Sequence, residues 1–188
     1  MYPYKYRFYG CKETFNLDAI VGREAKYRHI TRKCPVAKLA NGNCSCTGSY
    51  SDIKGHLQEN HLEGCCEYVE GDFKYIYKFS GMKFFRFIFA YNEIFFSLFL
   101  TKNSIFYAVL LYVGPSENAA KYKHKVEFVN KDNTEGVTVM HLTRSAGEDL
   151  RDVHRSGNCG NLDCDVVSRL KDEQSNLKFK LEIIRIGN

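Results

Sequence analysis

The chain has 188 residues, of which 44% are hydrophobic and 26% charged, so its composition suits a folded domain and argues against extended disorder. Its formal net charge of +5 is mild and falls short of the concentrated positive charge of a dedicated nucleic-acid-binding protein. The most apolar stretch, residues 84–113, is interrupted by Arg86, Glu93 and Lys102, so we expect buried strands there and no membrane span. The first residues lack the apolar run of a secretory signal, and we therefore expect a protein of the cytoplasm or the nucleus.

Cysteine is frequent and unevenly distributed. The chain has 8 cysteines, six of them in the first 66 residues, while Cys159 and Cys164 stand apart near the end. In a reducing compartment, clustered cysteines indicate a metal site more often than disulfides. We therefore expect two regions of different construction, the first of which depends on a metal.

Residues 34–64 carry a metal-ligand pattern of two thiols followed by two imidazoles, at Cys34, Cys44, His56 and His61. A Cys₂His₂ set fills all four positions of a tetrahedral zinc ion, so the pattern predicts one structural Zn²⁺ with no open position for a substrate. The spacing of the histidines is close to that of common zinc fingers, whereas the gap between the cysteines is longer than usual. Cys46 is a second choice for Cys44, because it shortens the gap to the first histidine.

A short helix is expected to present the two histidines. Ser51 is a good N-cap and Asp52 suits the positive end of the helix dipole, while Ile53 and Leu57 form an apolar stripe. The turn residues at positions 42 and 43 would let the two thiolates converge. The plainer alternative is a set of buried cysteines and surface histidines that bind no metal.

From about residue 68 the pattern changes to short alternating strands rich in aromatic and β-branched residues, which is typical of a mainly β, antiparallel sandwich. The expected strands cover residues 73–79, 85–89, 94–100, 105–113, 122–128, 137–139 and 177–183. Helices are expected at 163–173 and, more weakly, at 148–154. Cys65 and Cys66 are interpreted as core residues at the entry to the first strand.

The motif Gly10-Cys11-Lys12-Glu13-Thr14, the finger that begins at Cys34, and Gly71-Asp72-Phe73 before an all-β tail together resemble the seven in absentia family, particularly its insect members. The spacing from Cys44 through the two histidines matches the second zinc finger of that family. Members are RING-type E3 ubiquitin ligases with a RING, two zinc fingers and a TRAF-like β-sandwich. The resemblance thus implies a first finger at 1–33, a second finger at 34–64 and a TRAF-like domain at 65–188.

The first finger of the family falls on Tyr4, Cys11, Arg23 and Tyr27, where only the cysteine remains a ligand. Because arginine offers no lone pair and carries a fixed positive charge, we expect this finger to hold no metal. No RING is expected among these residues, since Cys11 is the only cysteine before residue 34 and a RING needs eight ligands. The chain alone should therefore have no ligase activity.

The resemblance also implies partners. In the family, an extended substrate peptide adds to the sandwich as a strand, and the corresponding strands here would be 73–79 and 84–91. Phe73, Tyr75, Phe85 and Phe87 are the expected peptide contacts, although a one-residue change of register would place the same rings in the core. A homodimer, or a heterodimer with full-length relatives, is expected.

Two other functions fit parts of the sequence. A nucleic-acid-binding finger protein is suggested by the Cys₂His₂ set. The expected finger helix, however, carries one lysine, Lys54, and two acidic residues, so we do not expect nucleic acid as a partner. A membrane is not expected as a partner either. A TRAF-like adaptor without a link to ubiquitin is the second alternative. No catalytic constellation is evident, and the proximity of Cys159 to His154 is interpreted as incidental.

Overall fold

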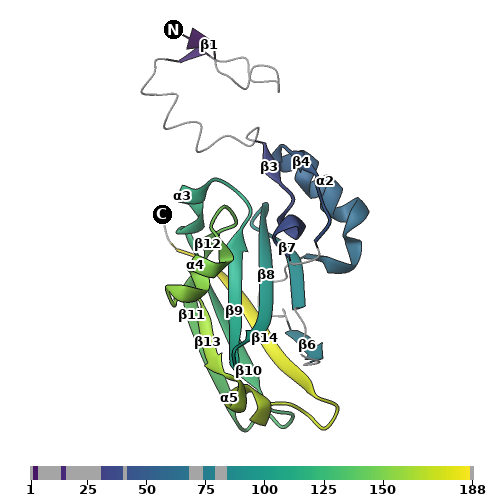
Figure 1. Ribbon diagram of the computed structural model, residues 1–188, viewed down its shortest axis with the longest axis vertical. Helices are drawn as coiled ribbons and strands as arrows, with labels where there is room; N and C mark the ends of the chain where they lie inside the picture. Colours follow the sequence, from purple (N-terminus) through teal and green to yellow (C-terminus); the bar gives the residue numbers. More distant parts are fainter. Residues whose placement is uncertain are drawn as a thin grey trace.

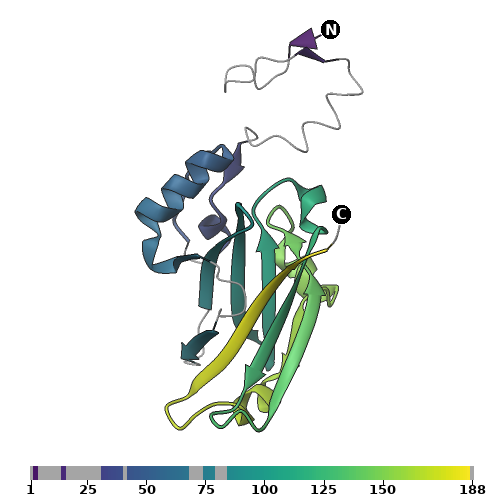
Figure 2. The same cartoon turned by 180° about the vertical axis from the view of Figure 1, so that it is seen from behind.

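The computed structural model describes residues 2–3, 14–15, 31–39, 42–67, 74–78 and 84–186, and side chains in all of these except the first two pairs and 74–78. This part of the chain is mainly β, as the sequence predicts. Two large sheets lie one behind the other, and the helix that carries the predicted histidines lies beside them (Figures 1 and 2).

The larger sheet has six strands, and its strand order is β12-β9-β8-β7-β5, with β13 also paired to β9. Its strands are β5 (Cys65–Glu67), β7 (Phe84–Ala90), β8 (Glu93–Lys102), β9 (Ile105–Tyr112), β12 (Arg144–Ser145) and β13 (Gly160–Asp163). The central strands β7, β8 and β9 form two consecutive antiparallel hairpins, whereas β5 and β12 add to the sheet in parallel.

Two-residue turns close both hairpins. Tyr91 and Asn92 have φ angles of 53° and 56°, and Asn103 and Ser104 have 52° and 61°. Two successive left-handed residues match the right-handed twist of the flanking strands, and asparagine tolerates this conformation better than most residues. The apolar stretch 84–113 is therefore a three-stranded meander, and no helix in the described part of the chain is long and apolar enough to cross a membrane.

The smaller sheet has four antiparallel strands in the order β11-β10-β14-β6. They are β6 (Lys74–Lys78), β10 (Tyr122–Val129), β11 (Gly136–Leu142) and β14 (Asn176–Arg185). Burial alternates strictly along β10 and β14, so the charged residues of these strands face outward and the apolar ones face the larger sheet. The predicted strands at 122–128 and 177–183 are confirmed.

The two sheets share an aromatic core. The ring of Phe99 on β8 lies 4.6 Å from that of Phe179 on β14 and 5.9 Å from that of Phe128 on β10, measured between centroids. Edge-to-face geometry dominates these contacts, as expected for buried aromatic rings. The inner faces of the sheets are thus packed against each other.

A second core covers the opposite face of the larger sheet. Ile53 and Leu57 of the finger helix are buried there with Phe87 and Phe96, whose rings stack at 4.9 Å. This core is continuous across residue 64, where the sequence places a domain boundary, so the metal-binding segment is packed onto the β region rather than tethered beside it.

The remaining elements are short. They are β1 (Tyr2–Pro3), paired with β2 (Thr14–Phe15); β3 (Arg32–Lys33), paired with β4 (Thr47–Gly48); the 3₁₀ turns η2 (Pro35–Lys38) and η3 (Leu62–Gly64); and the helices α2 (Tyr50–Asn60), α3 (Ser116–Ala119), α4 (Leu150–Arg155) and α5 (Cys164–Arg169).

The structure corrects one expectation about these elements. The helix expected at 163–173 is only α5, because Asp163 is its N-cap and the chain leaves the helix after Arg169. The two strands named for peptide binding, 73–79 and 84–91, belong to different sheets, since β6 pairs with β14 and β7 pairs with β8 and β5. Peptide binding by these strands stays a prediction.

Candidate metal centre

The two cysteines are brought together by a small ladder and a tight turn. Strand β3 pairs with β4, and the amide of Cys34 donates to the carbonyl of Cys46 at 2.8 Å. Gly42 closes the loop between the thiols, and a Cβ at this position would lie 1.8 Å from the carbonyl oxygen of Val36. Only glycine allows this approach, which supports the turn predicted there.

Helix α2 begins two residues earlier than expected. Ser49 is its N-cap, since the Ser49 hydroxyl accepts from the amide of Asp52 at 3.3 Å and the Ser49 amide donates to the Asp52 carboxylate at 2.8 Å. These bonds form a capping box. Hydrogen bonds that the Asp52 carboxylate accepts from Ser49 lower the pKa of Asp52, with the side-chain bond as the largest cause. The predicted N-cap, Ser51, is therefore wrong, and this residue is exposed in the first turn.

The packing of α2 sets the direction of its histidines. Ile53 and Leu57 are 1% and 0% exposed, and Tyr50 donates its hydroxyl to the carbonyl of Asn92 at 2.9 Å. These anchors fix the rotation of the helix against the sheet. His56 leaves the helix toward the cysteine loop, and His61 follows at the C-cap, where its amide donates to the carbonyl of Leu57.

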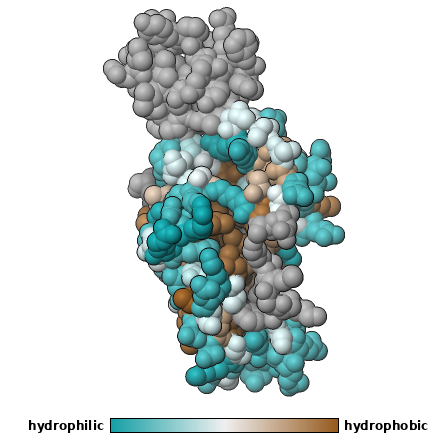
Figure 3. Space-filling view, in the orientation of Figure 1, coloured by the Kyte–Doolittle hydropathy of each residue, from teal (hydrophilic) through white to brown (hydrophobic). Residues whose placement is uncertain are grey.

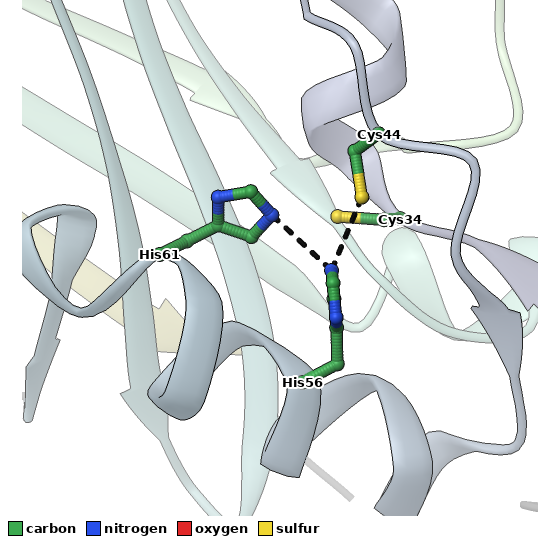
Figure 4. A group of neighbouring side chains, drawn as sticks. All are labelled: Cys34, Cys44, His56 and His61. Atoms are coloured by element: carbon green, nitrogen blue, oxygen red, sulfur yellow. Dashed lines mark hydrogen bonds between the residues drawn. The ribbon is translucent and has the colours of Figure 1, made fainter.

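The four predicted ligands converge. One donor atom from each of Cys34, Cys44, His56 and His61 lies within 4.8 Å of all the others. The Nε2 atom of His56 is 3.1 Å from the Sγ atom of Cys44 and 3.2 Å from the Nε2 atom of His61 (Figure 4). Donors bound to one tetrahedral zinc would lie about 3.3–3.8 Å apart. The group could therefore hold one metal ion with little movement.

Burial shapes the electrostatics of this group. Cys34 is 1% exposed, and burial, the largest cause, raises the pKa of its thiol to about 12. Burial also lowers the pKa of His61, and the neighbouring His56 lowers it further. Both effects disfavour a charged thiolate or imidazolium in the absence of a cation, whereas a divalent cation binds these groups as thiolate and neutral imidazole.

Two residues outside the predicted ligand set support the ligands. The side-chain amide nitrogen of Asn60 is 3.3 Å from the Nδ1 atom of His56 and donates to the His56 carbonyl at 3.1 Å. Cys65, expected to be a core residue, directs its thiol to the carbonyls of Leu57 and His61 at 3.4 Å. Asn60 could have been found from its spacing, because a residue four positions after a helical ligand lies beside it.

Cys46, the second choice for a ligand, contributes its backbone carbonyl and lies outside the group of four. Cys159 and His154 each contact a different residue. The Cys159 thiol faces the side-chain oxygen of Asn161 at 3.0 Å, and burial raises its pKa to about 11. The ring of His154 packs instead on Tyr107, with centroids 4.4 Å apart.

The expected peptide contacts have different surroundings. Phe87 is fully buried, and its ring centroid lies 6.4 Å from that of His61, so it cannot touch a peptide in this structure. Phe85 is half-buried at the edge of the same face. Tyr75 lies on β6 opposite Phe179, and Phe73 lies outside the described residues.

The four first-finger positions, Tyr4, Cys11, Arg23 and Tyr27, also lie outside the described residues. The expectation that this finger holds no metal therefore stays a prediction.

No protein-family model matches the chain, and no curated protein matches it. The resemblance to the seven in absentia family thus stays a prediction that depends on the motif residues.

Proposed function

We propose that this chain is the zinc-holding, substrate-binding part of a ubiquitin ligase of the seven in absentia type, without ligase activity of its own. The observation that carries the proposal is the convergence of two thiols and two imidazoles, at the spacing of that family's second finger, on the face of an aromatic β region. We also propose that the β region has the TRAF-like topology, that the chain forms a dimer and that it binds a substrate peptide.

Zinc is the ion that suits this donor set best. Two thiolates and two imidazoles in a closed four-coordinate arrangement are the donors of structural zinc sites, while oxygen-preferring ions such as Mg²⁺ and Ca²⁺ find no oxygen ligand among the four. Such a site has no position left for a reacting molecule. The metal would fix the cysteine loop to α2, and the role of the chain would be recognition.

Recognition by an added strand needs a sheet edge and a side-chain pocket beside it. In the described part of the chain, β6 ends the smaller sheet and β5 ends the larger one. Hydrophobic residues are visible in Figure 3 along the middle of the face where Figure 1 shows β7–β9, with hydrophilic residues to their left. Of the four expected contacts, Phe85 is the one whose described side chain is partly accessible on this face.

Substrate peptides of the family carry a Val-x-Pro core, so the first test is binding of a synthetic peptide with this core to the zinc-loaded chain. We expect saturable binding that the Phe85→Ala substitution weakens by about tenfold, since an aromatic anchor is worth more than 1 kcal/mol. Ile105→Ala is the matched control, because Ile105 is 37% exposed at a hairpin of the same sheet. Equal binding by a peptide with both motif residues changed to alanine would exclude this mode of recognition.

The second test is an in vitro ubiquitination reaction with E1 and E2. The chain alone is expected to give no ubiquitin conjugates, because recruitment of E2 requires a RING. Autoubiquitination of the isolated chain would contradict the proposal, and peptide binding without any associated ligase in cell extracts would favour an adaptor role.

A further inference from the structure

A hollow of about 770 Å³ lies where the metal-binding segment meets the β region. Its lining comes from three segments: 32–38 on β3 and η2, 113–117 between β9 and α3, and 145–147 between β12 and α4. This volume is within the range of ligand pockets, about 300–1,000 Å³. The hollow is separate from the four metal donors, except that Cys34 contributes to one wall.

Positive charge gathers on the wall formed by the metal-binding segment. Arg32, Lys33 and Lys38 line the hollow there, whereas Glu117 is the one acidic residue among the lining residues. Lys38 is half-buried, and burial lowers the pKa of its ammonium group, an effect that Asp149 and Glu148 partly offset. A partly desolvated cation of this kind gains more from an added anion than a solvated one does.

No carboxylate in the described part of the chain forms an ion pair with Lys38. Its ammonium group donates to a neutral acceptor, the backbone carbonyl of Glu148. The Glu148 carboxylate is bound by the Arg144 guanidinium and by the amide of Ser145 at 2.8 Å. The Asp149 carboxylate is likewise bound by Arg151, at 2.9 Å. The two nearby acids are therefore committed to other partners.

The opposite wall is small and held in place. Gly114 lies against the Tyr112 ring, where a Cβ would come within 2.1 Å of a ring atom, and Pro115 follows it. The amide of Ala146 donates to the Tyr112 carbonyl at 2.9 Å, and the amide of Gly147 donates to the Ser145 hydroxyl at 3.0 Å. Because these contacts hold the wall in place, the backbone of a bound peptide could lie beside the cations without any loop of the protein having to move.

We propose that this hollow binds an acidic peptide segment of a partner protein, with a carboxylate on Lys38 and the peptide backbone along the wall of small residues. A peptide suits the site better than a single small anion, because the cations are spread over residues 32–38 and the facing wall is made mostly of small residues. The site is distinct from the sheet edges considered above and does not depend on a link to ubiquitin.

The test is a titration of the full-length, zinc-loaded chain with an acetylated and amidated hexaglutamate peptide at fixed ionic strength. Saturable binding is expected, and Lys38→Met should weaken it by about tenfold or more, since removing one partner of a desolvated charge pair raises the dissociation rate strongly. Lys131→Met is the matched control: this exposed lysine at the tip of the β10–β11 hairpin has only a surface ion pair, and its loss should weaken binding by less than about twofold.

A second variant changes the shape of the hollow without changing the charge of the protein. Ser116 is exposed at the rim, so Ser116→Trp should fill the entrance, leave the melting temperature unchanged and weaken hexaglutamate binding as Lys38→Met does. Equal losses in Lys38→Met and Lys131→Met, or no saturable binding, would overturn the proposal. Inorganic phosphate that competes at the same concentration as the peptide would also overturn it, in favour of a small-anion site.

Discussion

His124 is a buried titratable residue on β10. It faces inward from β10, is 1% exposed, and neither ring nitrogen has a hydrogen-bond partner in the described structure. His141 lies directly opposite on β11, with ring centroids 6.3 Å apart, and Ile183 lies opposite on β14. Burial, the largest cause, lowers the pKa of His124 to about 3, and His141 contributes to the shift. The ring is therefore neutral in the folded protein.

This neutral histidine makes stability depend on pH. Because its pKa in the folded state lies below the ordinary value of 6.5, the unfolded chain binds the proton first as the pH falls. The contribution is present above pH 6.5 and is lost as the pH falls from about 6.5 toward 3. His124→Leu should flatten the fall of the free energy of unfolding over this range, measured by urea denaturation, and His141→Leu should flatten it less, because His141 is only half-buried. An unchanged slope in His124→Leu would contradict this account.

At the scale of elements, helix α2 depends on its first turn. The capping box between Ser49 and Asp52 satisfies two amides that the helix leaves without partners. Ser49→Ala should lower the free energy of unfolding by about 1 kcal/mol, since an N-cap is lost. Ser51→Ala, two residues later and exposed, should change it by less than about 0.5 kcal/mol. The reverse order in urea denaturation would restore the N-cap predicted from the sequence.

The elements that could be predicted from the sequence are those determined by nearby residues, through ligand spacing or hydrophobic alternation. The ligand spacing placed His56 on a helix and His61 at its end, beside two thiols, and alternation placed strands such as β10 and β14. Ser49 was missed because Ser51 also precedes the apolar stripe. The sequence left two possibilities for Phe87, a peptide contact or a core residue. Alternation along a strand separates its two faces but does not say which face a distant segment covers. The assignment of β6 and β7 to different sheets, and the short β12 and β13, depend on long-range pairing that no local pattern contains.

At the scale of the whole molecule, the metal-binding segment and the β region are one packed unit. Leu57 of α2 and Phe96 of β8 are both fully buried in the same core, on the outer face of the larger sheet. A structural zinc ion contributes on the order of 10 kcal/mol of apparent free energy to the fold that it closes. Loss of the metal should therefore loosen the segment and uncover aromatic surface.

Chelation tests this coupling. Treatment with phenanthroline should lower the melting temperature of the chain and increase the fluorescence of a hydrophobic dye, because the apolar face under α2 becomes accessible. A Cys44→Ser variant should show the same fluorescence without the chelator, which separates metal loss from an effect of the reagent. A chelated chain that melts at the same temperature and binds no dye would show that the segment is held by packing alone.

The most direct measurement of the central claim is the metal content of the purified full-length chain, determined by mass spectrometry of the elements. The account predicts one equivalent of zinc, lost in Cys44→Ser and in His56→Ala and retained in Cys46→Ser, because Cys46 lies outside the group of four. Zero equivalents would contradict the proposed zinc centre, and two equivalents would contradict the prediction that the first finger holds no metal.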